Sequence, residues 1–191
     1  MNKKYHFIIA FVLLTLIQLA VPAKMIWDSE GTLLHGERHL LQLFPIDPND
    51  PFRGKYINLR FEIENYITDQ PCIVEGESKQ YVTLYKGASR FSSVMNISTV
   101  RPKVDSYFNT DLYCYAIDSQ NSQYNLELPF KKYFMAESLA EGAERLATES
   151  LRDSTSDVYA EVFIHRGQAR IKHIYIGEQT IESVISENAY K

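Results

Sequence analysis

The chain has 191 residues, of which 45% are hydrophobic and 23% are charged, and its formal net charge is −4 at pH 7. This composition excludes a disordered chain, and the lack of a basic excess or a Lys/Arg-rich run argues against nucleic-acid binding. Aromatic residues make up 13% of the chain, which favours strands. The length beyond the first two dozen residues suits one domain or two small packed lobes.

The N-terminus predicts a segment for export or anchoring. Lys3 and Lys4 precede a run over residues 7–23 that contains no charged residue. This run predicts either a transmembrane anchor over residues 5–23 or a signal peptide that is cleaved after Ala23. The run is longer than the apolar core of a typical signal peptide, which favours the retained anchor.

Both interpretations keep the two lysines on the cytoplasmic side and export residues 24–191. We therefore expect a single-pass protein of the cytoplasmic membrane whose C-terminal domain lies outside the cytoplasm. Cleavage would instead give a periplasmic or secreted protein.

The exported part is predicted to begin with a mixed connector over residues 24–36 and a strand over residues 39–46. A loop with three prolines follows, because proline cannot donate to a sheet ladder. The clearest strand comes next and alternates with period two. Its inward residues are Ile57, Leu59, Phe61 and Ile63, and its outward residues are Tyr56, Asn58, Arg60 and Glu62. Further short strands are predicted over residues 80–86, 94–100 and 112–117.

The pattern changes in the second half. Apolar residues at helical spacing predict an amphipathic helix over residues 136–151. Alternating runs over residues 158–164 and 169–176 predict a hairpin around Gly167, and a last short strand is expected over residues 180–184. The predicted class is α+β, with a mainly antiparallel sheet or small sandwich, one packed helix and a C-terminal hairpin. The exported domain could form two lobes, over residues 37–118 and 126–191.

The two cysteines, Cys72 and Cys114, do not have the spacing of a zinc site. Neither belongs to a Cys-x-x-Cys pair, and no histidine lies at ligand spacing from either. In an oxidising compartment they could form one disulfide.

The sequence has no pattern that indicates catalysis, a metal or a cofactor. It lacks a Gly-x-Ser-x-Gly motif, a glycine-rich phosphate loop and a Cys–His pair. Asp47, Asp50 and Arg53 share one loop, which we interpret as a capped turn because the regular spacing of calcium ligands is missing. The histidines at positions 35, 39, 165 and 173 are scattered and predict no metal site.

Several strand residues have two interpretations. Four tyrosines on predicted strands either pack across strands, which we favour, or line a ligand-binding groove. They are Tyr81, Tyr85, Tyr113 and Tyr115. Glu62 and Glu64 are interpreted as a solvated face rather than an acid–base pair.

The stretch GKYINLRF at residues 54–61 combines a glycine, a tyrosine and alternating apolar residues. It resembles the signature of the bacterial GDYXXLXY protein family. Gly54, Tyr56 and Leu59 match the signature, while Phe61 replaces a Tyr and Lys55 replaces an Asp. The preceding Pro45, Asp47 and Pro48, residues 132–137 and the closing hairpin are also similar to the family. The resemblance implies a small membrane-anchored protein of unassigned activity without a known catalytic residue. Some such proteins accompany multi-pass membrane proteins.

The outward residues of this stretch are a candidate binding patch. A basic patch with an aromatic residue on an acidic protein suits an acidic partner, a polysaccharide or lipid headgroups. The patch contains Arg53, Lys55, Tyr56, Asn58 and Arg60.

We therefore expect a non-enzymatic accessory protein that is anchored in the membrane and binds another envelope or membrane protein. One alternative is a secreted ligand- or polysaccharide-binding module, which requires cleavage after Ala23 and an open groove. A further alternative is an envelope hydrolase, which requires acids or histidines to converge in a cleft.

Overall fold

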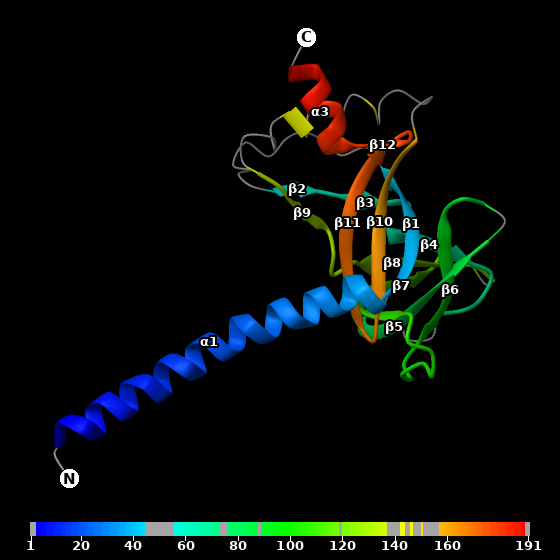
Figure 1. Ribbon diagram of the computed structural model, residues 1–191. Helices are drawn as coiled ribbons and strands as arrows, with labels where there is room; N and C mark the ends of the chain where they lie inside the picture. The colour runs from blue at the N-terminus through cyan, green and yellow to red at the C-terminus, as the bar shows by residue number, and fades with distance from the viewer. Residues whose placement is uncertain are drawn as a thin grey trace.

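The computed structural model describes residues 3–44, 56–72, 76–87, 89–118, 120–136 and 157–189, with a few single positions between residues 142 and 150. A long N-terminal helix projects from a β-rich domain (Figure 1). The strands of the domain pair in an antiparallel manner. This arrangement confirms the predicted α+β class.

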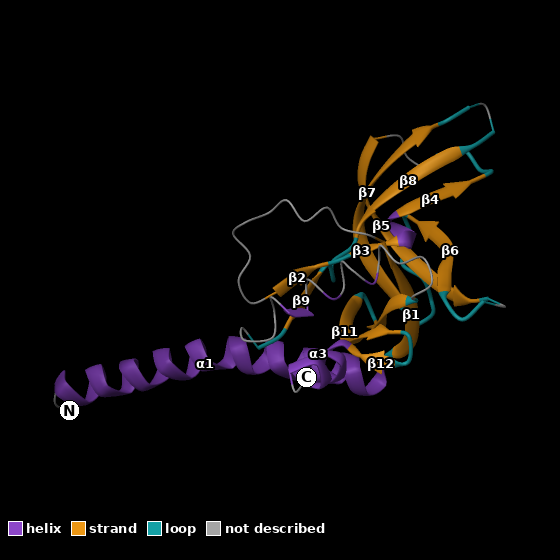
Figure 2. Ribbon diagram, turned by 90° about the horizontal axis from the view of Figure 1, so that it is seen from above, coloured by secondary structure: helices purple, strands orange, loops and turns teal. Residues whose placement is uncertain are grey.

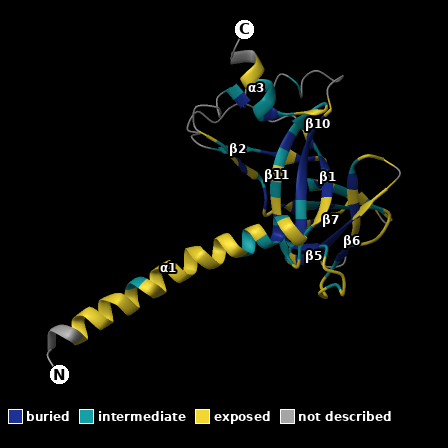
Figure 3. Ribbon diagram, in the orientation of Figure 1, coloured by how far each residue is buried: buried dark blue, intermediate teal, exposed yellow. Residues whose placement is uncertain are grey.

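The projecting helix, α1 (Lys3–His35), contains the predicted apolar segment and continues past it. The expected connector over residues 24–36 is wrong, because the helix includes nearly all of it. No proline interrupts this part, and Lys24 Nζ lies 2.5 Å from Asp28 Oδ2, a pairing four residues apart that suits a helix. Most of α1 is exposed (Figure 3). Its length, and the mean hydropathy of 2.2 over its most apolar 18 residues, are sufficient to cross a membrane, a property that anchors share with signal sequences.

One five-stranded sheet joins strands from both ends of the domain. Its order is β12-β11-β10-β1-β3. Its members are β1 (Glu37–Phe44), β3 (Arg60–Phe61), β10 (Val158–His165), β11 (Gln168–Ile176) and β12 (Gln179–Thr180). The predicted hairpin is confirmed, with Arg166 and Gly167 at φ of 46° and 90° between β10 and β11, as in a type I′ turn. Because β1 pairs with β10, this sheet draws on both of the lobes that the sequence suggests.

A second five-stranded sheet has the order β4-β8-β7-β5-β6. Its members are β4 (Asn65–Thr68), β5 (Gly76–Lys86), β6 (Ser92–Ser98), β7 (Tyr107–Ala116) and β8 (Ser122–Glu127). A disulfide joins Cys72, which follows β4, to Cys114 on β7, with the Cα atoms 5.9 Å apart. The bond therefore ties the segment that follows β4 to β7. Figure 2 shows this sheet on the side of the domain away from the N-terminus of α1.

The two sheets share one apolar core. Phe61 lies edge-on to Phe130 with ring centroids 5.4 Å apart, and Phe130 lies edge-on to Phe108 at 5.5 Å. The four predicted inward residues, from Ile57 to Ile63, are all buried.

The predicted strand that carries these residues is nevertheless divided. Its parts are β2 (Tyr56–Asn58), β3 and a 3-10 turn, η1 (Glu62–Glu64). The division arises because β2 pairs with β9 (Lys132–Phe134) whereas β3 pairs with β1.

Two expectations near the C-terminus have different outcomes. The strand over residues 180–184 is wrong beyond Thr180, because α3 (Ile181–Ala189) begins there. Ile181 and Ile185, four residues apart, both pack against the core, as expected for residues one turn apart on one face of a helix. Within the expected helix over residues 136–151, positions 142, 143, 146 and 150 are helical, and most of the rest lies outside the described residues.

Candidate functional site

The two-stranded ribbon of β2 and β9 presents part of the predicted patch. Antiparallel pairing places Tyr56 opposite Phe134 and Asn58 opposite Lys132. The Tyr56 and Phe134 ring centroids are 5.6 Å apart, and Lys132 Nζ lies 4.7 Å from the centre of the Tyr56 ring. Phe134 is 68% exposed. The ribbon thus carries an aromatic pair, of which Phe134 is exposed and Tyr56 is partly buried, with Lys132 above the Tyr56 ring.

The inner face of the ribbon holds it against the domain. Ile57 and Tyr133 are buried, and the Tyr133 hydroxyl donates to Glu182 Oε1 of α3 at 2.5 Å. Burial, and then the Glu182 carboxylate, raise the pKa of Tyr133 above its usual range. The Leu59 N–H donates to the Lys131 carbonyl at 2.7 Å, which extends the pairing beyond Asn58. The aromatic pair therefore lies on a ribbon whose opposite face packs into the domain.

The other members of the predicted patch do not gather on the ribbon. Arg60 lies on β3, outside the ribbon, and lines a groove over β7 and β8 that is described below. Arg53 and Lys55 lie outside the described residues, as do Pro45, Asp47, Pro48, Asp50 and Gly54 of the preceding loop. Leu59 and Phe61, expected as structural residues, are buried.

A groove lies between the end of α1, β9 and β11, with a cavity volume of about 680 Å³. We call it the α1–β9 groove. Ser29 of α1 forms one wall, Lys132 and Phe134 of β9 form another, and Arg170 and Lys172 of β11 form the third. Local sequence patterns do not reveal this groove, because its lining residues are far apart in the chain. The one sequence pattern that indicates the groove is the pair of basic residues two positions apart on β11, Arg170 and Lys172.

A second groove, of about 650 Å³, opens over β7 and β8. We call it the Tyr113 groove. Tyr113 is 51% exposed and lines this groove with the amides of Gln123 and Asn125 and the charged side chains of Arg60 and Asp111. An aromatic ring beside amides and mixed charges is a polar surface that suits a hydroxylated ligand.

The four tyrosines with two interpretations fall into separate places. Tyr81 packs edge-on against Tyr107, with centroids 5.7 Å apart. The rings of Tyr113 and Tyr115 are 6.1 Å apart, and both residues are exposed. Tyr85 is also exposed. The packing interpretation therefore applies to Tyr81, whereas Tyr113 lines a groove.

The histidines do not converge on a metal site in the part of the chain that the structure describes. There, no three His, Cys, Asp or Glu side chains lie close enough together to hold a metal ion. His39 is buried, with Nδ1 3.0 Å from Ser92 Oγ and Nε2 3.0 Å from Ser106 Oγ. Burial lowers the pKa of His39 to about 4, partly opposed by Glu37. His39 is therefore neutral and structural at pH 7.

Glu161 is a buried carboxylate that sequence analysis overlooked. It forms an ion pair with Arg38 of the neighbouring strand β1. Burial, and secondarily Glu161, raise the pKa of Tyr175. The signal in the sequence was a charged residue within the apolar run of β10. Glu161 lines neither of the two grooves, so we assign it to the joint between β1 and β10.

The fold and these surfaces define a β-rich domain carried on a long apolar helix, with two grooves that share Glu127 and Lys131 in their linings. The family model for GDYXXLXY proteins matches residues 18–174. The chain therefore belongs to the GDYXXLXY family, as its Gly54–Phe61 stretch predicts. Neither a curated protein nor a solved structure matched the chain.

Proposed function

We propose that this protein is a non-enzymatic accessory protein, anchored in the cytoplasmic membrane by α1, whose exported domain binds another membrane or envelope protein. One observation carries the proposal: α1 is exposed along its apolar length, while its last two turns pack on the domain. An apolar helix with no covering inside the protein is stable in a lipid bilayer.

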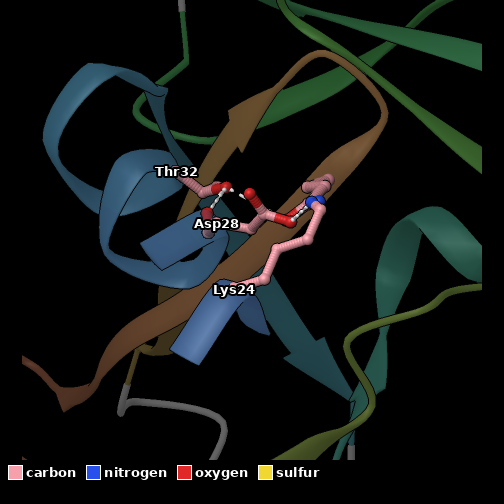
Figure 4. A network of polar contacts seen from close by, with 4 residues as sticks. Lys24, Asp28 and Thr32 are labelled. Carbon is pink, nitrogen blue, oxygen red and sulfur yellow. Dashed lines mark hydrogen bonds and ion pairs between the residues drawn. The ribbon is translucent and has the colours of Figure 1, made fainter. Parts of the chain in front are cut away.

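The last turns of α1 hold the domain close to the apolar segment. Thr32 is 3% exposed, and its hydroxyl lies 2.9 Å from the Asp28 carbonyl oxygen and 3.4 Å from Gln168 Oε1 of β11. Figure 4 shows Thr32 beside the Lys24–Asp28 ion pair. Arg170 Nε donates to Ser29 Oγ at 3.1 Å. Such a joint would keep the domain at a fixed height above the bilayer.

Charge and cysteine chemistry support export of the domain. Lys3 and Lys4 precede the apolar segment, and cytoplasmic flanks are rich in Lys and Arg. The Cys72–Cys114 disulfide is typical of proteins outside the cytoplasm.

The partner surface that we propose is the exposed face of the β2–β9 ribbon. Tyr56 and Phe134 form an aromatic pair next to Lys132, and aromatic residues supply much of the energy at protein interfaces. In both overall views the ribbon lies on the side of the domain from which α1 projects (Figures 1 and 2). A partner in the same membrane would therefore meet this face.

The test is site-specific photo-crosslinking in native membranes, with the crosslinker at Tyr56, Phe134 or Met95. Met95 is 66% exposed on β6 and serves as the matched control. The proposal predicts one membrane or envelope protein crosslinked from both Tyr56 and Phe134 and not from Met95. Phe134→Asp should reduce its co-purification at least tenfold, and Met95→Asp should not. Equal crosslinking from all three positions would contradict the proposal.

A second candidate function is polysaccharide binding in the Tyr113 groove. It is favoured by the exposed Tyr113 ring beside the Gln123 and Asn125 amides. Calorimetric titration of the whole protein with soluble cell-surface polysaccharide fragments tests it. This function predicts binding that Tyr113→Ala weakens at least tenfold, and absence of binding to any fragment would contradict it.

A further inference from the structure

The α1–β9 groove has an excess of positive charge on a protein whose formal net charge is −4. Five charged side chains line it, four of them basic: Lys131, Lys132, Arg170 and Lys172, with Glu127 as the carboxylate among the described lining residues. Lys131 is neutralised by Glu64, with Nζ–Oε2 of 3.4 Å. The other three make no ion pair with any described residue.

These three cations are held in place by neutral groups. The Arg170 guanidinium donates to Ser29 Oγ at 3.1 Å and to the Ala169 carbonyl at 2.9 Å. Lys132 Nζ lies over the Tyr56 ring, and Lys172 Nζ lies 5.5 Å from the centre of the Phe163 ring. Neutral partners orient a cation without cancelling its charge. The groove is therefore arranged for an anion.

The groove also lies at a defined height along α1. At 1.5 Å of rise per residue, the uncharged run over residues 7–23 is about 26 Å long, close to a hydrocarbon core of about 30 Å, and Lys24 and Trp27 follow at its outer end. Trp27 is 80% exposed, as expected for an aromatic residue at the membrane–water interface. Ser29 follows two residues later, about 3 Å along the helix, and so falls within the headgroup layer.

We infer that the α1–β9 groove binds the phosphate groups of anionic phospholipids in the outer leaflet of the membrane that α1 crosses. The inference rests on the anchoring role proposed above. Arg170 supplies a guanidinium fork that matches phosphate oxygens, and Lys132 and Lys172 supply point charges. Each basic residue near an anionic surface strengthens binding by about fivefold. Lipid bound here would fix the rotation of the domain about α1 and direct the ribbon toward one side.

The experiment uses the full chain in nanodiscs with equal amounts of phosphatidylcholine and phosphatidylglycerol. Native mass spectrometry of the ejected protein counts the lipids of each type that remain bound. The variant Lys132→Gln/Arg170→Gln/Lys172→Gln removes the three charges. The control Lys79→Gln/Arg101→Gln/Lys103→Gln removes three charges elsewhere in the domain. Should the first variant fail to fold, Lys132→Gln/Lys172→Gln leaves the Arg170 hydrogen bonds intact.

The wild type and the control are expected to retain phosphatidylglycerol preferentially. In the triple groove variant, the ratio of retained phosphatidylglycerol to phosphatidylcholine should fall at least tenfold. In the double variant, this ratio should fall by less. An unchanged preference in the groove variants would overturn the inference. Loss of the crosslinked partner protein without a change in lipid preference would also overturn it, since the groove would then be a protein site.

Fluorescence of Trp27 separates this inference from the anchoring proposal. Trp27 is the single tryptophan of the chain, and lipids brominated in their acyl chains should quench its emission when α1 is inserted. Quenching combined with an unchanged lipid preference rejects the headgroup site alone. Absence of quenching rejects the anchor as well.

Discussion

The two sheets of this domain are held in different ways. The first sheet, β12-β11-β10-β1-β3, receives α1 and is fixed to it by close backbone packing and by the buried Thr32. The second sheet, β4-β8-β7-β5-β6, is fixed by a disulfide and leaves Tyr113 and Tyr115 exposed. His39 of β1 connects the sheets through Ser92 and Ser106. The first sheet therefore fixes the position of the domain relative to α1. The second sheet is stabilised by the disulfide and leaves one of its faces exposed to solvent.

The largest expected effect comes from the disulfide in the second sheet. Cys72 and Cys114 are 42 residues apart in sequence, and closing a loop of this size restricts the unfolded chain by about 4 kcal/mol. Cys72→Ser/Cys114→Ser should therefore lower the free energy of unfolding by about that amount, measured by urea denaturation. A variant as stable as the wild type would show that the second sheet does not depend on this bond.

The next effect concerns the contact between the sheets. The pKa of His39 is about 4 in the folded protein and about 6.5 when unfolded. Only the unfolded chain binds the proton between these values, so stability is complete above pH 6.5 and falls as the pH drops to 4, by about 3 kcal/mol. His39→Gln should remove this dependence, and the same change at exposed His35 should leave it. Parallel stability profiles for both variants over this range would contradict the assignment.

A smaller effect is expected at the joint between α1 and the first sheet. A Cβ at Gly36 would lie 2.3 Å from the Thr32 carbonyl oxygen and 3.1 Å from the Ile164 nitrogen. Gly36→Ala should therefore destabilise the protein by about 1–3 kcal/mol and accelerate hydrogen exchange near Thr32. A Cβ at Gly31 meets nothing within 4 Å, so Gly31→Ala should stabilise the helix by up to about 1 kcal/mol. Effects of equal sign at the two glycines would refute the close packing.

The smallest effect is expected on the open face of the second sheet. Tyr113 is half exposed, so Tyr113→Ala should change the free energy of unfolding by less than about 0.5 kcal/mol. Thermal melting measures this directly. A loss of several degrees in Tm would mean that the ring supports the sheet rather than standing ready for a ligand.

Local patterns in the sequence predicted much of the fold. The alternation from Ile57 to Ile63 identified four core residues, and the apolar runs around Gly167 identified the hairpin. The pairing of β1 with β10 could not be predicted, because it joins residues more than a hundred positions apart and leaves no local periodicity. The strands β4, β8 and β9 were missed because they are short and rich in polar residues.

The candidate sites were less predictable for the same reason. Tyr56 was identified as an outward residue, but its neighbours Phe134 and Lys132 come from β9. Arg170 and Lys172 line a groove with the end of α1 only because the helix continues through the expected connector as far as His35. The lining of this groove comes from three segments that are distant in sequence. Its charged residues can therefore be identified only once the fold is known.

The central claim, that α1 remains attached as a membrane anchor, is tested most directly by the intact mass of the mature protein from native cells. The account predicts a protein in the membrane fraction that retains residues 1–23 and leaves the membrane only in detergent. A soluble protein that begins at Lys24 would contradict it, because cleavage there would remove the apolar part of α1.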